Sequence, residues 1–520
     1  MKKYLFVLCA LCLGTSGFAQ KAEKFANTIL AEDLKKHLSV IAHDSLEGRD
    51  TGSEGQRKAA LYITNHFKSL GLKAIGDNGT YLQAVPLVKR GLAEAYLKIG
   101  DVKKDNLKDF FLNGSGSIPQ ETTIEVVNVG YGIESDLYNS YKNLDVTGKA
   151  VLILTGEPKG ADGNYLVSGT DKSSIWSLSS ADLKKREVAR NKGAKFIIMV
   201  SDKSDEENEK TYSRMRSFAP RMNRMSFKDA KNPASAMIGI TLNQKTGKEY
   251  LGLDDAGIKE FLAGNKADLS PKPLIIKVEN KEEAVNTSNV LGFLEGTDKK
   301  DEVLVISAHY DHIGISSDGQ INNGANDDGS GTVSVMELAE AFAKAKAAGN
   351  GPRRSILFMT VTGEEKGLLG SEYYVNHPII PIENTIVDLN VDMVGRTDPD
   401  HEGGKPDYIY VIGSDKLSSE LHAIGEEMNK KYVNLDLDYK YNDPKDPNRF
   451  YYRSDHYNFA QKKIPIAFYF NGVHADYHKP TDDIEKIEFE KAAKVVKLVF
   501  YTAWEIANRD NRIVVDSNKP

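Results

Sequence analysis

The sequence contains only two cysteines, Cys9 and Cys12, and both lie within its first twenty residues. This stretch, MKKYLFVLCALCLGTSGFAQ, places two lysines before an apolar segment and ends in small residues, which is the pattern of a secretory signal peptide over residues 1–19. A mature chain that begins after Ala19 contains no cysteine, which excludes disulfides, a thiol nucleophile and cysteine metal ligands. We therefore expect an exported protein, either periplasmic or secreted.

The sequence also lacks a long apolar run and a strong excess of one charge. The apolar segment of the signal is too short to span a bilayer, and no later segment is apolar enough, so we expect no permanent membrane anchor. Lysine and arginine number 68 against 74 aspartates and glutamates, which argues against a broad basic surface for nucleic acid. A length of 520 residues allows two or more domains, and the oligomeric state stays open.

Apolar strands alternate with helices from about residue 285 to the end of the chain. The alternation predicts an α/β fold, with a mixed, mostly parallel sheet covered by helices on both faces. Residues 29–72 predict two further helices, which we assign to the same domain. The expected strands are 289–294, 303–308, 356–361, 385–391, 408–412 and 464–470.

The residues between these two parts have a different character. TTIEVVNVGYG and GKAVLILTGEP predict short strands, and KKREVARNKGAKFIIMVSD predicts a helix followed by a buried strand. We therefore expect a smaller, β-rich α/β domain over residues 111–272, inserted into a domain made of residues 20–110 and 273–520. The polar and basic stretch 206–233 predicts a surface loop within the inserted domain.

Side chains that can bind metals or transfer protons follow four of the expected strands at their carboxyl ends. This is where ligands bind in open α/β sheets. A further acidic pair, Asp327 and Asp328, opens a helix between the strands 303–308 and 356–361. The residues that follow the strands are His309-Tyr310-Asp311-His312, Glu364-Glu365, Asp392, and a loop with His474, Asp476, His478 and Asp482.

Imidazoles and carboxylates without cysteine suit zinc. Each motif alone also fits an ordinary turn, helix cap or hydrogen-bonded histidine, but here several meet at one sheet edge. One zinc needs three protein ligands and a water, whereas five candidate ligands with a bridging carboxylate suit two ions, about 3.5–4 Å apart. Since adjacent residues at a strand end point in different directions, one of Glu364 and Glu365 can bind metal while the other acts as general base in amide or ester hydrolysis.

Five motifs, SAHYDH, NNGANDDGSG, TGEEKGLLGS, LNVDMVGR and YHKPTDD, occur in that order at familiar separations. Together they resemble the M28 family of co-catalytic zinc aminopeptidases, over roughly residues 30–90 and 285–510. LDVTGKAVLIL and ARNKGAKFIIMV resemble the protease-associated (PA) domain that is often inserted in these enzymes. The resemblance implies an aminopeptidase that removes N-terminal residues from peptides with two Zn²⁺ per chain.

The resemblance also implies a role for individual residues. Glu364 would be the general base, and a cis peptide bond would join Asp327 to Asp328. Asp311 and Asp482 would orient the imidazoles of metal ligands, and Asp328 would support the ligands without binding metal itself. The metal ligands would be His309 and Asp392 on one ion, Glu365 and His478 on the other, and Asp327 between both. Less specific matches make Asp455, His456, Tyr477 and Arg396 candidates for contact with the substrate.

Three other functions stay open at this point. A carboxypeptidase or dipeptidase of the same family would remove or release a C-terminal residue. A glutaminyl cyclase would use the same fold with one zinc, and a non-catalytic binding protein would have lost metal ligands. The five intact ligand positions and the TGEEKGLLGS motif favour the peptidase, but they leave the preferred N-terminal residue open.

Overall fold

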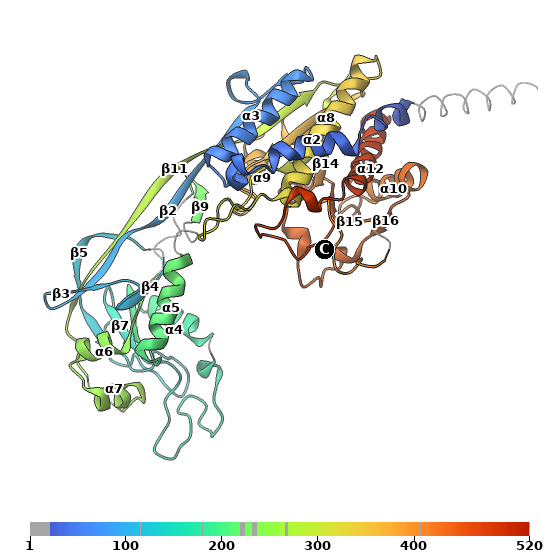
Figure 1. Cartoon of the computed structure of the whole chain (residues 1–520). Helices are drawn as coiled ribbons and strands as arrows, with labels where there is room; N and C mark the ends of the chain where they lie inside the picture. The colour runs from blue at the N-terminus through green and yellow to red at the C-terminus, as the bar shows by residue number, and fades with distance from the viewer. Residues whose placement is uncertain are drawn as a thin grey trace, which may run out of the picture. The chain divides into compact units, whose positions relative to one another are not determined.

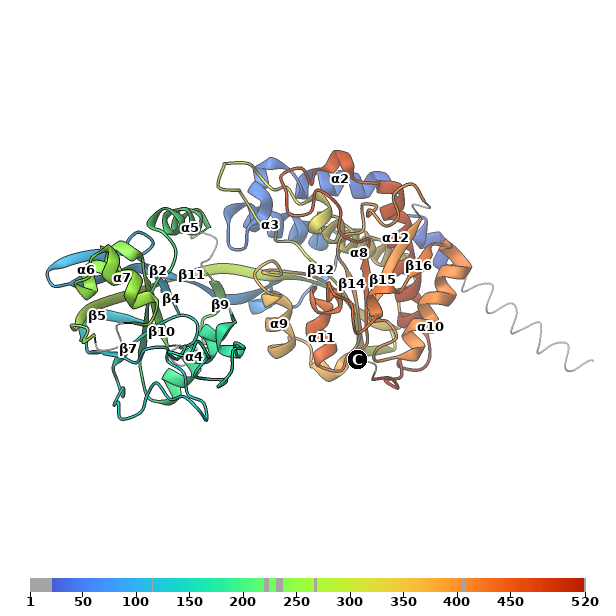
Figure 2. The same ribbon diagram turned by 90° about the horizontal axis from the view of Figure 1, so that it is seen from below.

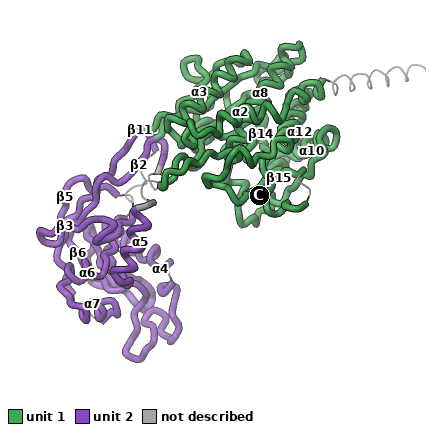
Figure 3. The backbone as a smooth tube through the Cα atoms, viewed as in Figure 1, with its two compact units in different colours: residues 1–87, 284–520 green, residues 88–283 purple. Residues whose placement is uncertain are grey.

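The computed structural model describes residues 21–518 except 115, 179, 219–223, 231–236, 266–268 and 405–406. The predicted signal peptide, residues 1–19, lies outside the described residues. The chain forms two compact units: unit 1 contains the residues up to 87 and from 284 onward, and unit 2 contains residues 88–283 (Figure 3). Among the helices within the described ranges, none has the length and apolar character needed to cross a membrane.

The unit boundaries differ from those that the sequence predicts, which were 110/111 and 272/273. Both chain crossings lie inside long strands, β2 (Leu82–Ile99) and β11 (Leu274–Leu294). The middle of β11 is a polar, exposed run, ENKEEA, which separates two apolar ends, and the sequence predicts a strand only at the second end, over residues 289–294. A boundary placed by composition therefore misses a strand that continues through a polar stretch.

Unit 1 is built on a mixed sheet whose strands include, in spatial order, β16-β15-β17-β14-β12-β13-β11. The four central strands, β17, β14, β12 and β13, are parallel, whereas β15 runs antiparallel to β17 and β11 runs antiparallel to β13. The edge strand β16 pairs in parallel with β15. This arrangement confirms the predicted mixed, mostly parallel sheet. The strands are β12 (Lys299–His309), β13 (Arg354–Val361), β14 (Thr385–Val391), β15 (Tyr408–Ile412), β16 (Asp436–Asp438), β17 (Ile466–Phe470) and the short β1 (Lys73–Ala74).

Helices cover both faces of this sheet (Figures 1 and 2). Alternate residues of β12 point to opposite faces: Leu304 and Ile306 join one apolar core, and Val303 and Val305 join another. The first core contains residues of α2 (Ala31–Ile41), α3 (Glu54–Ser69), α8 (Gly331–Ala347), α10 (Ser419–Met428) and α12 (Phe489–Asn508). The second contains residues of α9 (Leu369–Asn376) and α11 (His456–Gln461).

Unit 2 contains a separate five-stranded sheet with the order β4-β10-β8-β7-β6. Its strands are parallel except for β4, which pairs antiparallel with β10. The elements are β4 (Phe110–Asn113), β6 (Val126–Asn128), β7 (Ala150–Ile153), β8 (Phe196–Val200), β10 (Ile238–Leu242), α4 (Ala181–Asn191), α6 (Gln244–Leu251) and α7 (Asp255–Leu262). Three shorter strands are β3 (Val102–Asp105), β5 (Ile118–Ile124) and β9 (Arg224–Phe227).

One local prediction in unit 2 is wrong. Much of the stretch expected to be a surface loop forms the helix α5 (Asp205–Phe218), and β9 follows it. Three acidic residues, 205–207, lie in the first turn of α5. Their negative charges stabilise the helix by interacting with the positive end of its dipole. Glu206 also pairs with Lys210 one turn later. Because the helix has little apolar periodicity, its polar composition resembles that of a loop.

Candidate metal centre

The carboxyl ends of the four parallel strands bring most of the predicted ligands to one edge of the unit 1 sheet. His309 is the last residue of β12, and Asp392 directly follows β14. Glu364 and Glu365 lie just beyond β13, which pairs with β12. The loop after β17 carries His478. We call the group at this edge the strand-end cluster; its members are His309, His312, Asp327, Glu364, Glu365, Asp392 and His478.

Asp327 lies between two imidazoles of the strand-end cluster. It belongs to a short π-helical turn, Ala325–Ser330, that precedes α8, and its peptide bond to Asp328 is cis, as the family resemblance implies. Its Oδ1 atom is 3.4 Å from Nε2 of His309, and its Oδ2 atom is 3.0 Å from Nε2 of His478. A carboxylate with one oxygen toward each imidazole has the arrangement of a bridging ligand.

His309, Glu364 and Asp392 form one half of the cluster. Nε2 of His309 is 3.7 Å from Oδ1 of Asp392 and 3.9 Å from Oε2 of Glu364. The hydroxyl of Ser454 donates a hydrogen bond to the other oxygen of Asp392, at 2.7 Å. Oδ1 of Asp392 is buried and has no hydrogen-bond partner among the residues that the structure describes, so this oxygen is available to a cation.

Glu365, His478 and His312 form the other half. Oε1 of Glu365 is 2.9 Å from Nδ1 of His312 and 3.1 Å from Nε2 of His478. His312 is a residue to which we assigned no role from the sequence, although it ends the motif SAHYDH. Both of its ring nitrogens are buried; Nε2 has no hydrogen-bond partner within the described ranges, and the contact of Nδ1 with Glu365 does not have hydrogen-bond geometry. The second histidine of that motif was the available signal, and its approach to Glu365 becomes visible only in the folded chain.

These distances fit the coordination of zinc. Ligands that share one ion at about 2.0–2.2 Å lie about 3.3–3.6 Å from one another, and the neighbouring donor atoms here are 2.9–3.9 Å apart. Oδ2 of Asp327 and Oε1 of Glu365 are buried, and their short contacts with imidazole nitrogens do not have hydrogen-bond geometry in the described part of the chain. Buried polar atoms without partners cost free energy, which a bound cation would offset. The donor set therefore suits a divalent metal ion.

The two adjacent glutamates have opposite electrostatic environments. Burial raises the pKa of Glu364 well above its usual range, and the charges of Glu365 and Asp455 raise it further. Burial also acts to raise the pKa of Glu365, but the imidazoles of His312 and His478 lower it to about 2. Glu365 is thus held as an anion, while Glu364 is a group that can carry a proton.

Three predicted supporting carboxylates make contacts that differ in part from expectation. Asp328 accepts hydrogen bonds from the backbone N–H groups of His309, Gly331 and Met393, which ties together the ends of β12 and β14 and the start of α8. The backbone carbonyl of Asp311, rather than its carboxylate, lies 3.0 Å from Nδ1 of His309. The carboxylate instead accepts hydrogen bonds from Thr51 and from the N–H of Glu364.

Asp482 also departs from the expected role. We expected its carboxylate to orient His478, but Oδ2 accepts hydrogen bonds from the backbone N–H groups of Asn326 and Asp327, both at 3.1 Å. The reason is geometric, because the chain turns between His478 and Asp482 and directs the carboxylate toward the π-helical turn. Asp482 therefore supports Asp327.

A small pocket opens onto the strand-end cluster. His309, Asp327, Glu364 and Asp392 form its polar side. The remaining lining is mostly apolar and aromatic: Met393, Phe450, Arg453, Phe468, Phe470, Val473 and Tyr477. The ring of Tyr477 stacks on that of His478 with centroids 3.9 Å apart, so this candidate residue lies where the sequence predicts.

The other three candidates for substrate contact do not line this pocket. The carboxylate of Asp455 is buried and accepts a hydrogen bond from Ser371 at 2.5 Å. Nε2 of His456 lies 2.8 Å from the carbonyl of Tyr451. The guanidinium of Arg396 pairs with Asp476 at 3.0 Å. The contacts of all three fix the surrounding loops.

Arg49 supports the cluster from a part of the chain far away in sequence. It is fully buried, and its guanidinium donates hydrogen bonds to the carbonyls of Ile41, Tyr310, Asn323 and Gly324. These bonds fasten the loop after β12 and the segment before Asp327. No sequence pattern indicates this role, because the acceptors are backbone atoms distributed along the chain.

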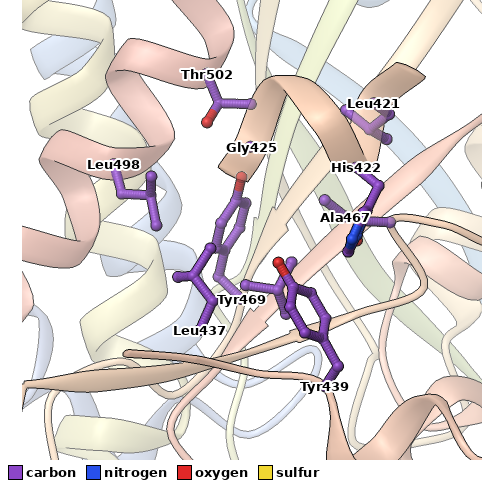
Figure 4. Close-up of a pocket in the computed structure, with 11 residues that line it drawn as sticks. Leu421, His422, Gly425, Leu437, Tyr439, Ala467, Tyr469, Leu498 and Thr502 are labelled. Atoms are coloured by element: carbon purple, nitrogen blue, oxygen red, sulfur yellow. The ribbon is translucent and has the colours of Figure 1, made fainter. Parts of the chain in front are cut away.

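A second pocket of unit 1 has no such chemistry (Figure 4). Side chains of α10, β17 and α12 line it, among them Leu421, Tyr469 and Leu498. The only imidazole in its lining, that of His422, lies 3.0 Å from the hydroxyl of Ser414, and no carboxylate belongs to the lining residues. The lining of this pocket therefore does not offer the donors of a metal site.

Known proteins resemble this chain in sequence and in fold. Residues 289–503 match the model of peptidase family M28. A "Probable zinc metalloprotease" of Pyrenophora tritici-repentis is 28% identical over 352 residues, and a "probable leucine aminopeptidase 2" of Aspergillus oryzae is 30% identical over 251 residues. Aminopeptidase YwaD of Bacillus subtilis is 25% identical over 291 residues.

These alignments cover only parts of the proteins. They span 59%, 47% and 54% of this chain, and 68%, 42% and 57% of the respective relatives. Among solved structures, the aminopeptidase from Aneurinibacillus sp. strain AM-1 has the same fold, with a TM-score of 0.52 and 22% identity over 95% of this chain and 98% of that one. These similarities show that residues 289–503 resemble peptidase family M28, and that the chain is similar in sequence to proteins described as zinc metalloproteases and aminopeptidases.

Proposed function

We propose that this protein is an exported aminopeptidase that hydrolyses the N-terminal residue of peptide substrates with two zinc ions. One observation carries the proposal. The adjacent carboxylates of Glu364 and Glu365 enter different halves of the strand-end cluster, and Asp327 lies between those halves. The two neighbouring acids thus take different roles: Glu365 is placed to bind metal, and Glu364 is placed to transfer a proton.

We assign the metal ligands accordingly. His309 and Asp392 would hold one zinc, Glu365 and His478 the other, and Asp327 both. When bound, the zinc pair supplies Lewis acidity that polarises the scissile carbonyl and activates water. The unpartnered oxygens of Asp327, Glu365 and Asp392 support this assignment.

Glu364 is the proposed general base. Its carboxylate lines the pocket, and its N–H donates a hydrogen bond to Asp311, which holds the loop that presents it. Burial raises its pKa, which suits a carboxylate that accepts a proton from the attacking water and then delivers it to the leaving amine. Asp311 thereby acts as a positioning residue for Glu364.

The pocket walls suggest the class of substrate. Phe450, Phe468, Phe470 and Val473 present carbon atoms beside the polar side formed by the cluster. An apolar side chain of the N-terminal residue would lose less hydration there than a charged one. We therefore propose a preference for apolar N-terminal residues.

Arg453 favours one alternative, a carboxypeptidase or dipeptidase. Its side chain belongs to the pocket lining and packs over the ring of Phe450, with the guanidinium 5.0 Å from the ring centroid. A guanidinium at this place could bind the terminal carboxylate of a short peptide. A glutaminyl cyclase would require a single zinc and would cyclise N-terminal glutamine.

A set of blocked substrates tests the proposal. We expect hydrolysis of leucyl and phenylalanyl arylamides, loss of activity with a zinc chelator and recovery on addition of Zn²⁺. An aminopeptidase should cleave a carboxy-blocked dipeptide and fail on the matching amino-blocked one. The reverse preference would establish the carboxypeptidase, and zinc-dependent cyclisation without hydrolysis would establish the cyclase.

Two further parts of the proposal concern unit 2 and the N-terminal segment. We interpret unit 2 as a protease-associated domain, which its separate mixed sheet supports. We also interpret residues 1–19 as a signal peptide. N-terminal sequencing of the protein recovered from the medium or periplasm should begin at Gln20, whereas an intact Met1 on exported protein would contradict cleavage.

A further inference from the structure

A second group of imidazoles and carboxylates lies in unit 1, outside the strand-end cluster. It comprises His37 of α2, His66 of α3, and Glu337 and Glu340 of α8, and we call it the helix cluster. Ligand atoms of His37, His66 and Glu340 lie within 4.8 Å of one another. Nε2 of His37 is 3.5 Å from Oε1 of Glu337. Three helices thus bring three potential donors together, and Glu337 approaches one of them, His37.

The two imidazoles have hydrogen bonds that suit metal ligands. Nε2 of His66 lies 3.2 Å from the carbonyl of Met336, which can only accept, so Nε2 bears the proton and Nδ1 of the neutral ring keeps its lone pair. Nδ1 of His37 lies 2.8 Å from the hydroxyl of Tyr62. Donation to that hydroxyl leaves the lone pair of Nε2 directed toward Glu337. A ring that donates from one nitrogen and offers the other is the usual state of a zinc-bound histidine.

Glu337 supplies an independent sign that a ligand is needed. Its side chain is 1% exposed, and Oε1 has no hydrogen-bond partner among the described residues. The 3.5 Å separation from His37 exceeds the 2.7–3.2 Å that is typical of a hydrogen bond. A buried carboxylate oxygen without a partner is unfavourable, and a cation between the two side chains would satisfy it.

Glu340 completes the donor set from the same face of α8, since it follows Glu337 by three residues. Lys344 pairs with its Oε1 atom at 2.6 Å, which leaves the second carboxylate oxygen for another partner. Lys344 is therefore the cation that competes with a metal ion at this position. His37 and His66 are separated from Glu340 by more than two hundred residues, so an ion here would join the N-terminal helices to α8.

We propose that the helix cluster is a metal site separate from the reaction centre, and that it binds a divalent transition-metal ion of the zinc class. His37, His66 and Glu340 offer three donors, and the buried Glu337 beside His37 offers a fourth, which is the number that a structural site requires. None of the four residues lines the pocket beside the strand-end cluster. The ion would therefore stabilise the packing of α2, α3 and α8 and would take no part in hydrolysis.

Metal counting tests this proposal with Zn²⁺ as the probe. The purified full-length protein is saturated with Zn²⁺, freed of loosely bound ions on a chelating resin and analysed by mass spectrometry for zinc per chain. We expect His66→Gln and the double variant Glu337→Gln, Glu340→Gln each to contain one ion fewer than the wild type. His377→Ala, which changes an exposed histidine elsewhere, is the matched control and should keep the wild-type count.

The result does not depend on the function proposed for the strand-end cluster, because it is the difference between two counts. The same one-ion loss should appear when His66→Gln is placed on a His478→Ala background. A second measurement covers variants that fold poorly: Zn²⁺ added to the metal-free His478→Ala protein should raise its Tm, and His66→Gln should reduce that shift. Equal zinc counts with and without His66→Gln, together with an unchanged Tm shift, would overturn the proposal.

Discussion

The strand-end cluster and the helix cluster both combine imidazoles with carboxylates in unit 1, yet they are built from different elements. The strand-end cluster takes its residues from the ends of parallel strands and from the loops that follow them. The helix cluster takes its residues from the faces of three packed helices. Loops at a strand edge leave space for a pocket, whereas helices packed on a sheet enclose their side chains.

This difference shows that residue composition alone does not identify a reaction centre. Both groups have donors for a metal ion, but only the strand-end cluster also presents a carboxylate, that of Glu364, in the lining of a pocket. A metal that is fully surrounded by protein donors stabilises a fold, and one beside a pocket and a free base can act on a substrate. The predictions below test this distinction.

The largest effect is expected for Asp327→Ala. Removal of the carboxylate between the two halves should release zinc and lower kcat/KM by about 10³-fold or more. Zinc content and arylamide hydrolysis, measured on the same preparation, check this outcome. Glu340→Ala removes a carboxylate from the helix cluster and should lower turnover by less than about tenfold. An equal loss of turnover in both variants would contradict the functional separation of the two clusters.

A smaller effect is expected for His312→Ala. This imidazole approaches Glu365 to 2.9 Å, and its removal should weaken zinc binding by about 10–100-fold. Competition with a chromophoric chelator measures the affinity, and His377→Ala serves as a surface control. Unchanged affinity would mean that His312 only fills space beside the ligands, and the second half of the cluster would then be smaller than we describe.

A change in selectivity is expected for Val473→Asp. This partly exposed residue lines the apolar side of the pocket, so a carboxylate there should disfavour leucine and favour lysine at the N-terminal position of the substrate. The ratio of kcat/KM for leucyl and lysyl arylamides should change by about tenfold. A constant ratio would place the side chain of the N-terminal residue elsewhere, while parallel losses on both substrates would indicate structural damage.

The smallest effect concerns a buried carboxylate that belongs to neither cluster. Burial raises the pKa of Asp388 to about 8, despite a hydrogen bond from Ser307 at 2.7 Å. The unfolded chain releases this proton near pH 4, so between about pH 4 and pH 8 the folded state binds more protons. Stability is therefore lost as the pH rises through this range.

Asparagine at this position cannot ionise, so Asp388→Asn should remove that loss. The Tm of the variant minus that of the wild type should increase by several degrees between pH 5 and pH 8, equivalent to about 3–4 kcal/mol. Thermal unfolding at the two pH values measures it. A difference that stays constant or decreases would show that Asp388 is ionised in the folded protein.

The sequence predicts the strand-end cluster well, and physical reasons explain why. Apolar strands that end in polar motifs are local patterns, and the carboxyl ends of parallel strands share one sheet edge. His309, the pair Glu364 and Glu365, and Asp392 could therefore be assigned to one place. The distances between these side chains depend on which strands are neighbours in the sheet, and no local sequence pattern contains that order.

Other features depend on contacts between distant segments and could not be predicted in this way. His37 and His66 each stand alone on an amphipathic helix, where a single histidine resembles an ordinary surface residue. Only the packing of α2 and α3 against α8 brings both histidines to Glu340 and His37 to Glu337. The contacts of Arg49 with backbone carbonyls are equally invisible in the sequence, as is the turn that directs Asp482 toward Asp327.

The division of roles between the two adjacent glutamates is the central claim, and one paired measurement tests it most directly. Glu364→Gln and Glu365→Gln are purified in parallel, and zinc per chain and turnover are determined for each. We predict that both lose turnover, by about 10²–10⁴-fold or more, while only Glu365→Gln loses zinc. Equal zinc loss in the two variants, or substantial turnover in Glu364→Gln with its zinc retained, would contradict the account.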